Sequence, residues 1–288
     1  MSIERKKNLL GRAGVAALLV GLTACSPMNE GEGEGERAPS TGGEGGGYSA
    51  PAGEGGESGE GGEGGGGGEF GIDPAQAAAN PVTYLTALEV MRAHYLAGIA
   101  AYDADRRAVA AEMFTHPISE IYVDLEEVLV GLGAPEFGDV LATAAAAPYD
   151  GSTDEQIRAN VDTVLAAIDS AEAYAPDSGH SEASIAAQVA VNMIMRAALQ
   201  YEFAASADMH NGPYLDGFGF HRAAEVMTQR HLDEIRALDA GTADALLAAL
   251  AALAEAYPTA IAPTPLDADS DQLIALAEAA SAAAERLE

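Results

Sequence analysis

The chain has 288 residues and is strongly acidic, with 14 Lys and Arg against 45 Asp and Glu and a formal net charge of −31. A field of that sign repels nucleic-acid phosphates, so DNA or RNA binding is not expected. Cys25 is the only cysteine, which excludes a disulfide framework.

Residues 1–24 are predicted to be a lipoprotein signal peptide. A basic segment containing Lys6 and Lys7, the only lysines, precedes the apolar run VAALLVGLTAC, which is too short to span a bilayer. Residues 22–25, Leu-Thr-Ala-Cys, resemble a bacterial lipobox. The resemblance implies cleavage before Cys25 and lipid attachment to its thiol, although an ordinary signal peptide with a chance cysteine is the alternative. We therefore expect a lipid-anchored protein of the bacterial cell envelope, facing the periplasm or the surface, and Ser26 favours the outer membrane.

Residues 25–72 are predicted to be the lipidated Cys25 followed by a disordered linker. Stretches such as GEGEGE and GGEGGGGGEF carry almost no apolar residues and repeat like charges. Such a segment buries too little surface to offset its ordering entropy. We interpret it as a solvated spacer; weak collection of cations is the alternative.

Residues 73–288 are predicted to form one all-helical domain, because Ala, Leu, Val and Met recur there at helical spacing. Asn80 and Pro81 suit a helix start, and Thr153 or Ser152 opens a capping-box-like pattern. Helices are expected within residues 79–107, 103–114, 114–129, 134–147, 152–174, 181–207, 218–239, 242–257 and 271–288. Short links between them predict an all-α antiparallel bundle of about eight or nine helices.

The stretch FTHPISEIYVDLEEVL, residues 114–129, offers one candidate site. On a straight helix its apolar residues share one face, and His116, Glu120 and Asp124 lie on the other. Since His116 precedes Pro117, where we expect a helix to begin, a capped and solvated face is the preferred interpretation. A surface groove that binds a divalent ion through His116, Glu120 and Asp124 is the alternative.

The region 181–239 offers a second candidate site. The helix within 181–207 is apolar nearly all round, which predicts a central position, and three histidines follow it within 22 residues. On the next helix His231 is expected to be buried and His221 half-buried. A metal or small-ligand pocket would draw on Glu202, His210, Asp216, His221, Glu225 and His231. The alternative is ordinary core histidines held by hydrogen bonds.

Two stretches resemble helical periplasmic proteins that accompany bacterial iron uptake, including imelysin-type proteins and extracytoplasmic domains of iron permeases. YEFAASADMHNGPYLDGFGF is similar to their Glu-Tyr … Asn … Glu-Tyr-Gln-Asp … Gly-Phe pattern, and HYLAGIAAYDADRRAVAAEMFTHPISEIYVDLE is similar to their N-terminal hairpin. The matching positions are Tyr201, Asn211, Tyr214, Asp216, Gly219 and Phe220, and His94, His116, Pro117, Glu120 and Tyr122.

The resemblance covers about a third of residues 73–288 and has departures. Pro213 stands where the pattern has Glu, Leu215 stands where it has Gln, and RHLDE keeps only the His-x-x-Glu of the imelysin motif, through His231 and Glu234. The Glu that Pro213 replaces would be a metal ligand, so its absence weighs against metal binding by this part of the chain.

These observations define two hypotheses, and an enzyme is not expected because no catalytic or cofactor motif is present. The first is a membrane-anchored, non-enzymatic binding or accessory module whose ligand is iron or another divalent cation, working with a transport or envelope protein. The second is a structural or scaffolding lipoprotein that binds a protein partner without metal.

Overall fold

The computed structural model describes residues 72–206 and 211–287, which form an all-α fold. The predicted signal peptide, Cys25, the linker up to residue 71 and His210 lie outside the described residues. Nine of the described helices have nine residues or more. The elements are α1 (Pro74–Ala77), α2 (Pro81–Asp103), α3 (Arg107–His116), the π-helix η1 (Pro117–Tyr122), α4 (Val123–Leu132), α5 (Gly138–Ala146), α6 (Asp154–Glu172), α7 (Glu182–Ser206), α8 (Asn211–Leu238), α9 (Ala240–Ala256), α10 (Ser270–Ala284) and the 3-10 turn η2 (Glu285–Leu287).

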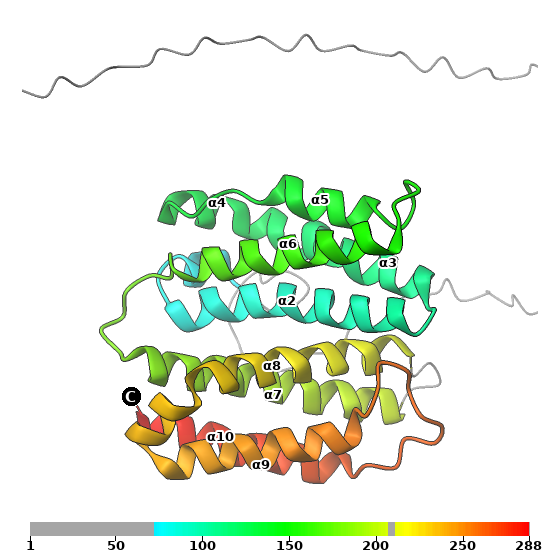
Figure 1. Ribbon diagram of the computed structural model, residues 1–288. Helices are drawn as coiled ribbons and strands as arrows, with labels where there is room; N and C mark the ends of the chain where they lie inside the picture. The colour runs from blue at the N-terminus through cyan, green and yellow to red at the C-terminus, as the bar shows by residue number, and fades with distance from the viewer. Residues whose placement is uncertain (1–71, 207–210, 288) are drawn as a thin grey trace, which may run out of the picture. The chain divides into compact units, whose positions relative to one another are not determined.

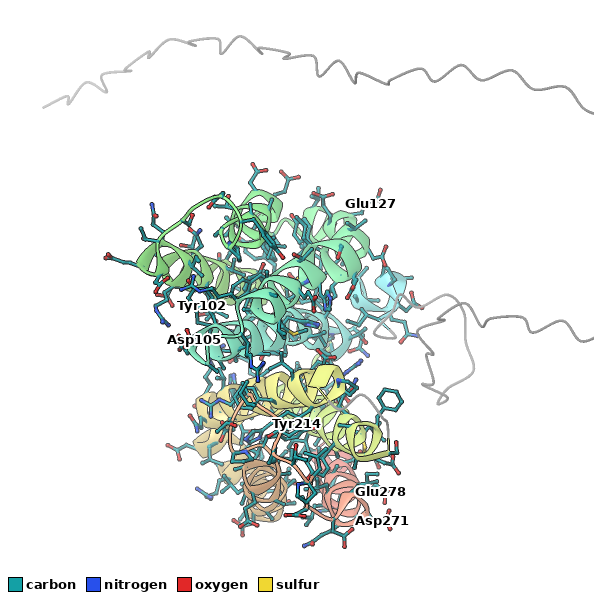
Figure 2. The ribbon with its side chains drawn as sticks, turned by 90° about the vertical axis from the view of Figure 1, so that its right-hand side faces the viewer. Tyr102, Asp105, Glu127, Tyr214, Asp271 and Glu278 are labelled. Atoms are coloured by element: carbon teal, nitrogen blue, oxygen red, sulfur yellow. The ribbon has the colours of Figure 1, made fainter. Side chains whose placement is uncertain are left out.

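Helix α2 lies between two groups of helices (Figure 1). On one side it packs against α3 and α6, and α5 adjoins both of them; on the other it packs against α7 and α8, which adjoin α9. We call α2–α6 the first half and α7–α10 the second half. In a second view, Tyr102 and Glu127 belong to the first half and Tyr214 and Glu278 to the second (Figure 2). Because neighbours cover α2 on both sides, 16 of its residues are buried.

Several helix starts follow the predicted capping chemistry. Asn80 Oδ1 accepts a hydrogen bond from Val82 N at 2.8 Å, and Pro81 occupies the first helical position of α2. The Thr153 hydroxyl and the Gln156 side chain cap α6 reciprocally. These predictions are confirmed.

The segment 107–132 differs from the prediction. A helix does not begin at His116, because α3, η1 and α4 follow one another without a break. Pro117 has no N–H to donate, so the α-helical ladder is interrupted there, and the backbone widens into a π-turn. Tyr95 donates a hydrogen bond to the Phe114 carbonyl at 3.2 Å, and Ser119 donates to the Thr115 carbonyl at 3.1 Å. These hydroxyl groups bond carbonyls around the irregular turn.

Helix α8 begins at Asn211, seven residues before the expected start. Pro213 fits the first turn of a helix, where an N–H would have no intrahelical partner. Gly217 and Gly219 lie within this helix. At both positions a neighbouring residue leaves no room for a side chain, so glycine is required. A Cβ on Gly219 would lie 2.5 Å from the Ala93 carbonyl oxygen, and one on Gly217 would lie 1.9 Å from the Tyr257 hydroxyl. The glycines therefore mark close packing and not a loop.

Candidate metal centre

Three side chains with metal-binding atoms converge where α2 crosses the end of α3. His94, His116 and Glu120 each offer one ligand atom, and these atoms all lie within 4.8 Å of one another. Among the described residues this is the only such group of three or more His, Cys, Asp or Glu side chains. The structure thus unites two residues of the predicted His116 group with a histidine from the preceding helix.

His94 is oriented as metal-binding histidines usually are. The side chain is buried, with 2% of its surface exposed, and Nδ1 lies 2.8 Å from the Val90 carbonyl oxygen. Burial lowers the pKa of His94 to about 4, against the effect of the Val90 bond, and His116 lowers it further. The ring is therefore neutral at pH 7, with the proton on Nδ1 donated to Val90. The Val90 bond holds the ring by Nδ1, and Nε2 is the nitrogen that would coordinate an ion.

His116 and Glu120 come from the junction of α3 and η1. The His116 ring meets the His94 ring edge-on, with centroids 5.7 Å apart. His116 Nδ1 lies 4.0 Å from Glu120 Oε2, which is too long for a hydrogen bond but is compatible with two ligands of one ion. Their side chains are 35% and 22% exposed, so solvent reaches the group from this side.

Asp124 does not join this group and is exposed, as the capped-face interpretation expects. His116 and Glu120 are half-buried, so they are less solvated than that interpretation expects. A projection onto a straight helix places His116, Glu120 and Asp124 on one face. A π-turn contains one more residue than an α-turn, so it rotates His116 and Glu120 away from the residues of α4.

The metal set predicted within residues 181–239 is not brought together. His221 Nε2 lies 3.8 Å from Glu225 Oε1, but Glu225 also pairs with Arg222. Glu202 is exposed on α7, and Asp216 is half-buried on α8 and lies outside the group of three ligand atoms.

The expected burial of the two helical histidines is reversed. His221 is buried, with 2% of its surface exposed, and His231 is half-buried. The His221 ring stacks on Tyr257 with centroids 6.3 Å apart. Burial, and secondly Arg222, lower the pKa of His221 to about 4, so this histidine is neutral at pH 7. It has the character of a core histidine.

Sequence reasoning without the resemblance missed the pairing of His94 with His116, although the chain carries a signal for it. His94 lies eleven residues before Asp105, and His116 lies eleven residues after it. Asp105 has a φ of 60° in the tight turn that joins α2 to α3. Positions equidistant from the centre of a helical hairpin lie at the same level, and here both rings point to the partner helix and meet edge-on.

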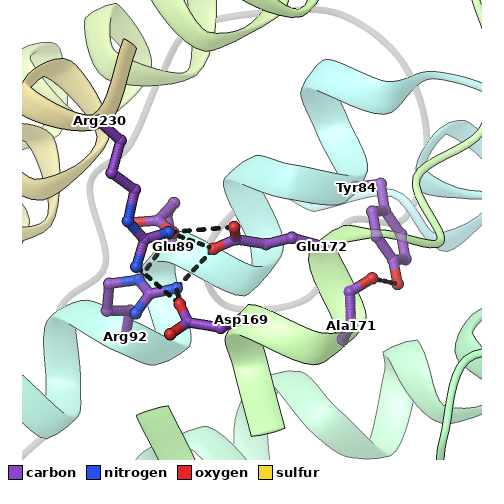
Figure 3. A network of polar contacts seen from close by, with 7 residues as sticks. All are labelled: Tyr84, Glu89, Arg92, Asp169, Ala171, Glu172 and Arg230. Atoms are coloured by element: carbon purple, nitrogen blue, oxygen red, sulfur yellow. Dashed lines mark hydrogen bonds and ion pairs between the residues drawn. The ribbon is translucent and has the colours of Figure 1, made fainter. Parts of the chain in front are cut away.

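A second polar cluster, which we call the arginine network, joins α2, α6 and α8 (Figure 3); Glu89 and Arg92 are buried in it, and its other members are partly exposed. Arg92, 3% exposed, donates from Nε to Glu89 Oε1 at 2.8 Å and from Nη2 to Asp169 Oδ1 at 2.8 Å. Its Nη2 also lies 2.5 Å from Glu172 Oε1. Arg230 of α8 donates to the same two acidic residues of α6, at 2.6 Å to Asp169 and 3.1 Å to Glu172. Two guanidinium groups thus face three carboxyl groups.

The charge of this cluster is balanced when Glu89 holds a proton. Burial raises the pKa of Glu89 to about 7; Arg92 opposes that shift and the carboxylate of Glu172 adds to it. Its ion pairs join side chains of α2 and α8 to the same two acidic residues of α6, so the network ties the two halves together. We assign it a structural role.

Comparison with protein-family models, with curated proteins and with solved structures finds no match. None of the described helices is long and apolar enough to cross a membrane.

Proposed function

We propose that this chain is a lipid-anchored protein of the bacterial cell envelope whose helical domain binds a divalent transition-metal ion through His94, His116 and Glu120. The observation that carries the proposal is the approach of three ligand atoms from α2, α3 and η1 to within 4.8 Å of one another. The lipobox-like residues 22–25 support the anchor.

The donor set narrows the class of metal. Two imidazole nitrogens and one carboxylate oxygen suit Fe²⁺, Zn²⁺ and related ions, whereas Ca²⁺ and Mg²⁺ prefer oxygen ligands. Three protein ligands leave coordination positions open for water or for a small anion. Iron is the cation favoured by the resemblance to iron-uptake proteins, and the role that follows is delivery or storage of that ion beside a transport protein.

The test is isothermal titration of the full chain with Fe²⁺, Zn²⁺ and Mn²⁺ at high salt. The chain carries Cys25→Ser, so that no thiol takes part, and is purified in detergent. High salt screens diffuse binding to the acidic residues but screens a half-buried site much less. We expect saturable binding that His116→Ala and Glu120→Gln weaken at least tenfold, because each removes one ligand.

The matched control is His231→Ala, which removes a half-buried histidine of α8 outside the centre. It should leave the affinity unchanged. Binding that disappears at high salt, or that survives loss of both His116 and Glu120, would contradict the proposal and favour the scaffolding hypothesis.

A further inference from the structure

Tyr95 lies next to His94 on α2, and its hydroxyl group reaches the helix that ends at His116. The hydroxyl donates a hydrogen bond to the Phe114 carbonyl oxygen at 3.2 Å, and the two rings stack with centroids 5.6 Å apart. Both side chains are fully buried. Tyr95 thus holds Phe114 by its backbone and by its ring, two residues before the His116 ligand.

Gly98, one turn further along α2, lies against the same ring. A Cβ at Gly98 would lie 2.5 Å from Phe114 Cε1, so the ring occupies the space that a side chain at this position would fill. Closely packed contacts of this kind resist small displacements. Helix α3 is therefore held against α2 at the level of Phe114.

The segment that follows Phe114 depends on such support, because the α-helical ladder is interrupted there. Pro117 has no N–H to donate to the Met113 carbonyl, and the π-helix η1 begins at this residue. A π-turn is a rare backbone form that persists where the surrounding structure holds it. The direction in which the two ligands of this segment point is then set by contacts between α2 and α3.

We propose, resting on the function proposed above, that Tyr95 is a positioning residue of the metal centre: its hydrogen bond to the Phe114 carbonyl sets where His116 and Glu120 lie relative to His94. Tyr95 acts through the backbone of Phe114 and not by binding the ion. Adjacent residues of α2 thus supply one ligand and fix the segment that supplies the other two.

The test is titration of the full chain carrying Cys25→Ser with Co²⁺ at high salt, followed by visible absorption. Co²⁺ accepts imidazole and carboxylate ligands, and its absorption bands depend on the number and arrangement of these ligands. Tyr95→Phe keeps the buried ring and removes only the hydroxyl group. Loss of a group that orients metal ligands typically weakens binding by about 10–100-fold. We expect Tyr95→Phe to bind Co²⁺ about tenfold more weakly, at the low end of that range, with shifted bands.

The matched control is Tyr84→Phe. Tyr84 is also fully buried on α2, and its hydroxyl donates to the Ala171 carbonyl of α6 at 2.9 Å, a helix that supplies no ligand to the centre. This variant should lower the Tm but leave the Co²⁺ affinity and the bands unchanged. Gly98→Ala, whose Cβ would press on the Phe114 ring, disturbs the same contact independently and should also weaken binding and shift the bands.

Unchanged Co²⁺ affinity and bands in Tyr95→Phe, or equal changes in Tyr84→Phe, would overturn the positioning role and leave the metal proposal intact. Gly98→Ala decides the matter where Tyr95→Phe fails to fold. Failure of the metal proposal gives a different result, namely no saturable Co²⁺ binding by the unaltered chain, or binding that His116→Ala does not weaken.

Discussion

Replacing Glu89 by Gln should stabilise the protein, and the gain should depend on pH. Glu89 is wholly buried between Arg92 and Glu172, and its pKa is raised from 4.5 to about 7, chiefly by burial. The folded carboxyl thus binds its proton more tightly than the unfolded one, and folding takes up a proton between these two pH values. The stability that Glu89 contributes is complete below pH 4.5 and is lost as the pH rises to about 7.

The size of the effect follows from the two pKa values. The difference between 4.5 and about 7, at about 1.4 kcal/mol for each tenfold change in proton affinity, is worth about 3 kcal/mol. Glutamine imitates the protonated side chain, because its oxygen accepts from Arg92 and its amide can donate toward Glu172. Glu89→Gln should match the wild type at pH 4.5 and exceed its free energy of unfolding by about 3 kcal/mol at pH 8.

The assay is urea denaturation, followed by far-ultraviolet circular dichroism, at several pH values. Only the difference between variant and wild type is interpreted, because His94 and His221 have pKa values lowered to about 4 and impose the opposite pH dependence on both proteins. The exposed Glu112→Gln measures the effect of removing one surface charge. A difference that is constant with pH, or a Glu89→Gln variant less stable than the wild type at pH 8, would refute the reasoning.

Two further predictions concern packing and capping. Gly219→Ala should cost about 1–3 kcal/mol, seen as a lower Tm, because its Cβ would press on the Ala93 carbonyl, whereas Gly212→Ala in open space should be neutral or slightly stabilising. Equal effects of the two changes would contradict the close-packing argument. Thr153→Ala should cost about 1 kcal/mol in urea denaturation, because it removes the cap of α6, and an unchanged midpoint would show that the capping box is not formed in solution.

Much of the fold could be predicted from local sequence. Caps such as Asn80 and Thr153 and the recurrence of apolar residues locate most helices, because these signals act within one or two turns. The start of α8 was misplaced because Pro213, Gly217 and Gly219 carry a loop signal locally, while the requirement for a small residue comes from Ala93 and Tyr257 on other helices.

The candidate site was less predictable for the same reason. His116 and Glu120 lie one turn apart and could be paired from spacing, but His94 joins them only through the geometry of a hairpin. The arginine network was missed entirely, since Arg92 and its partners on α6 are about eighty residues apart in the chain. Burial of a charged side chain is decided by tertiary contacts, which a single helix projection does not contain.

Because of the π-turn at residues 117–122, the geometry of the metal centre depends on the number of residues in this segment as well as on the identity of the ligands. Deleting one residue in a helix ordinarily rotates everything beyond it out of register. Here, deleting Ser119 would let a plain α-helix form between α3 and α4. Both histidines and Glu120 would remain in such a protein, but Glu120 would follow His116 by three residues, which changes its position relative to the two histidines. Among related sequences, a one-residue gap at this point would therefore predict a centre of altered geometry, even where every candidate ligand is present.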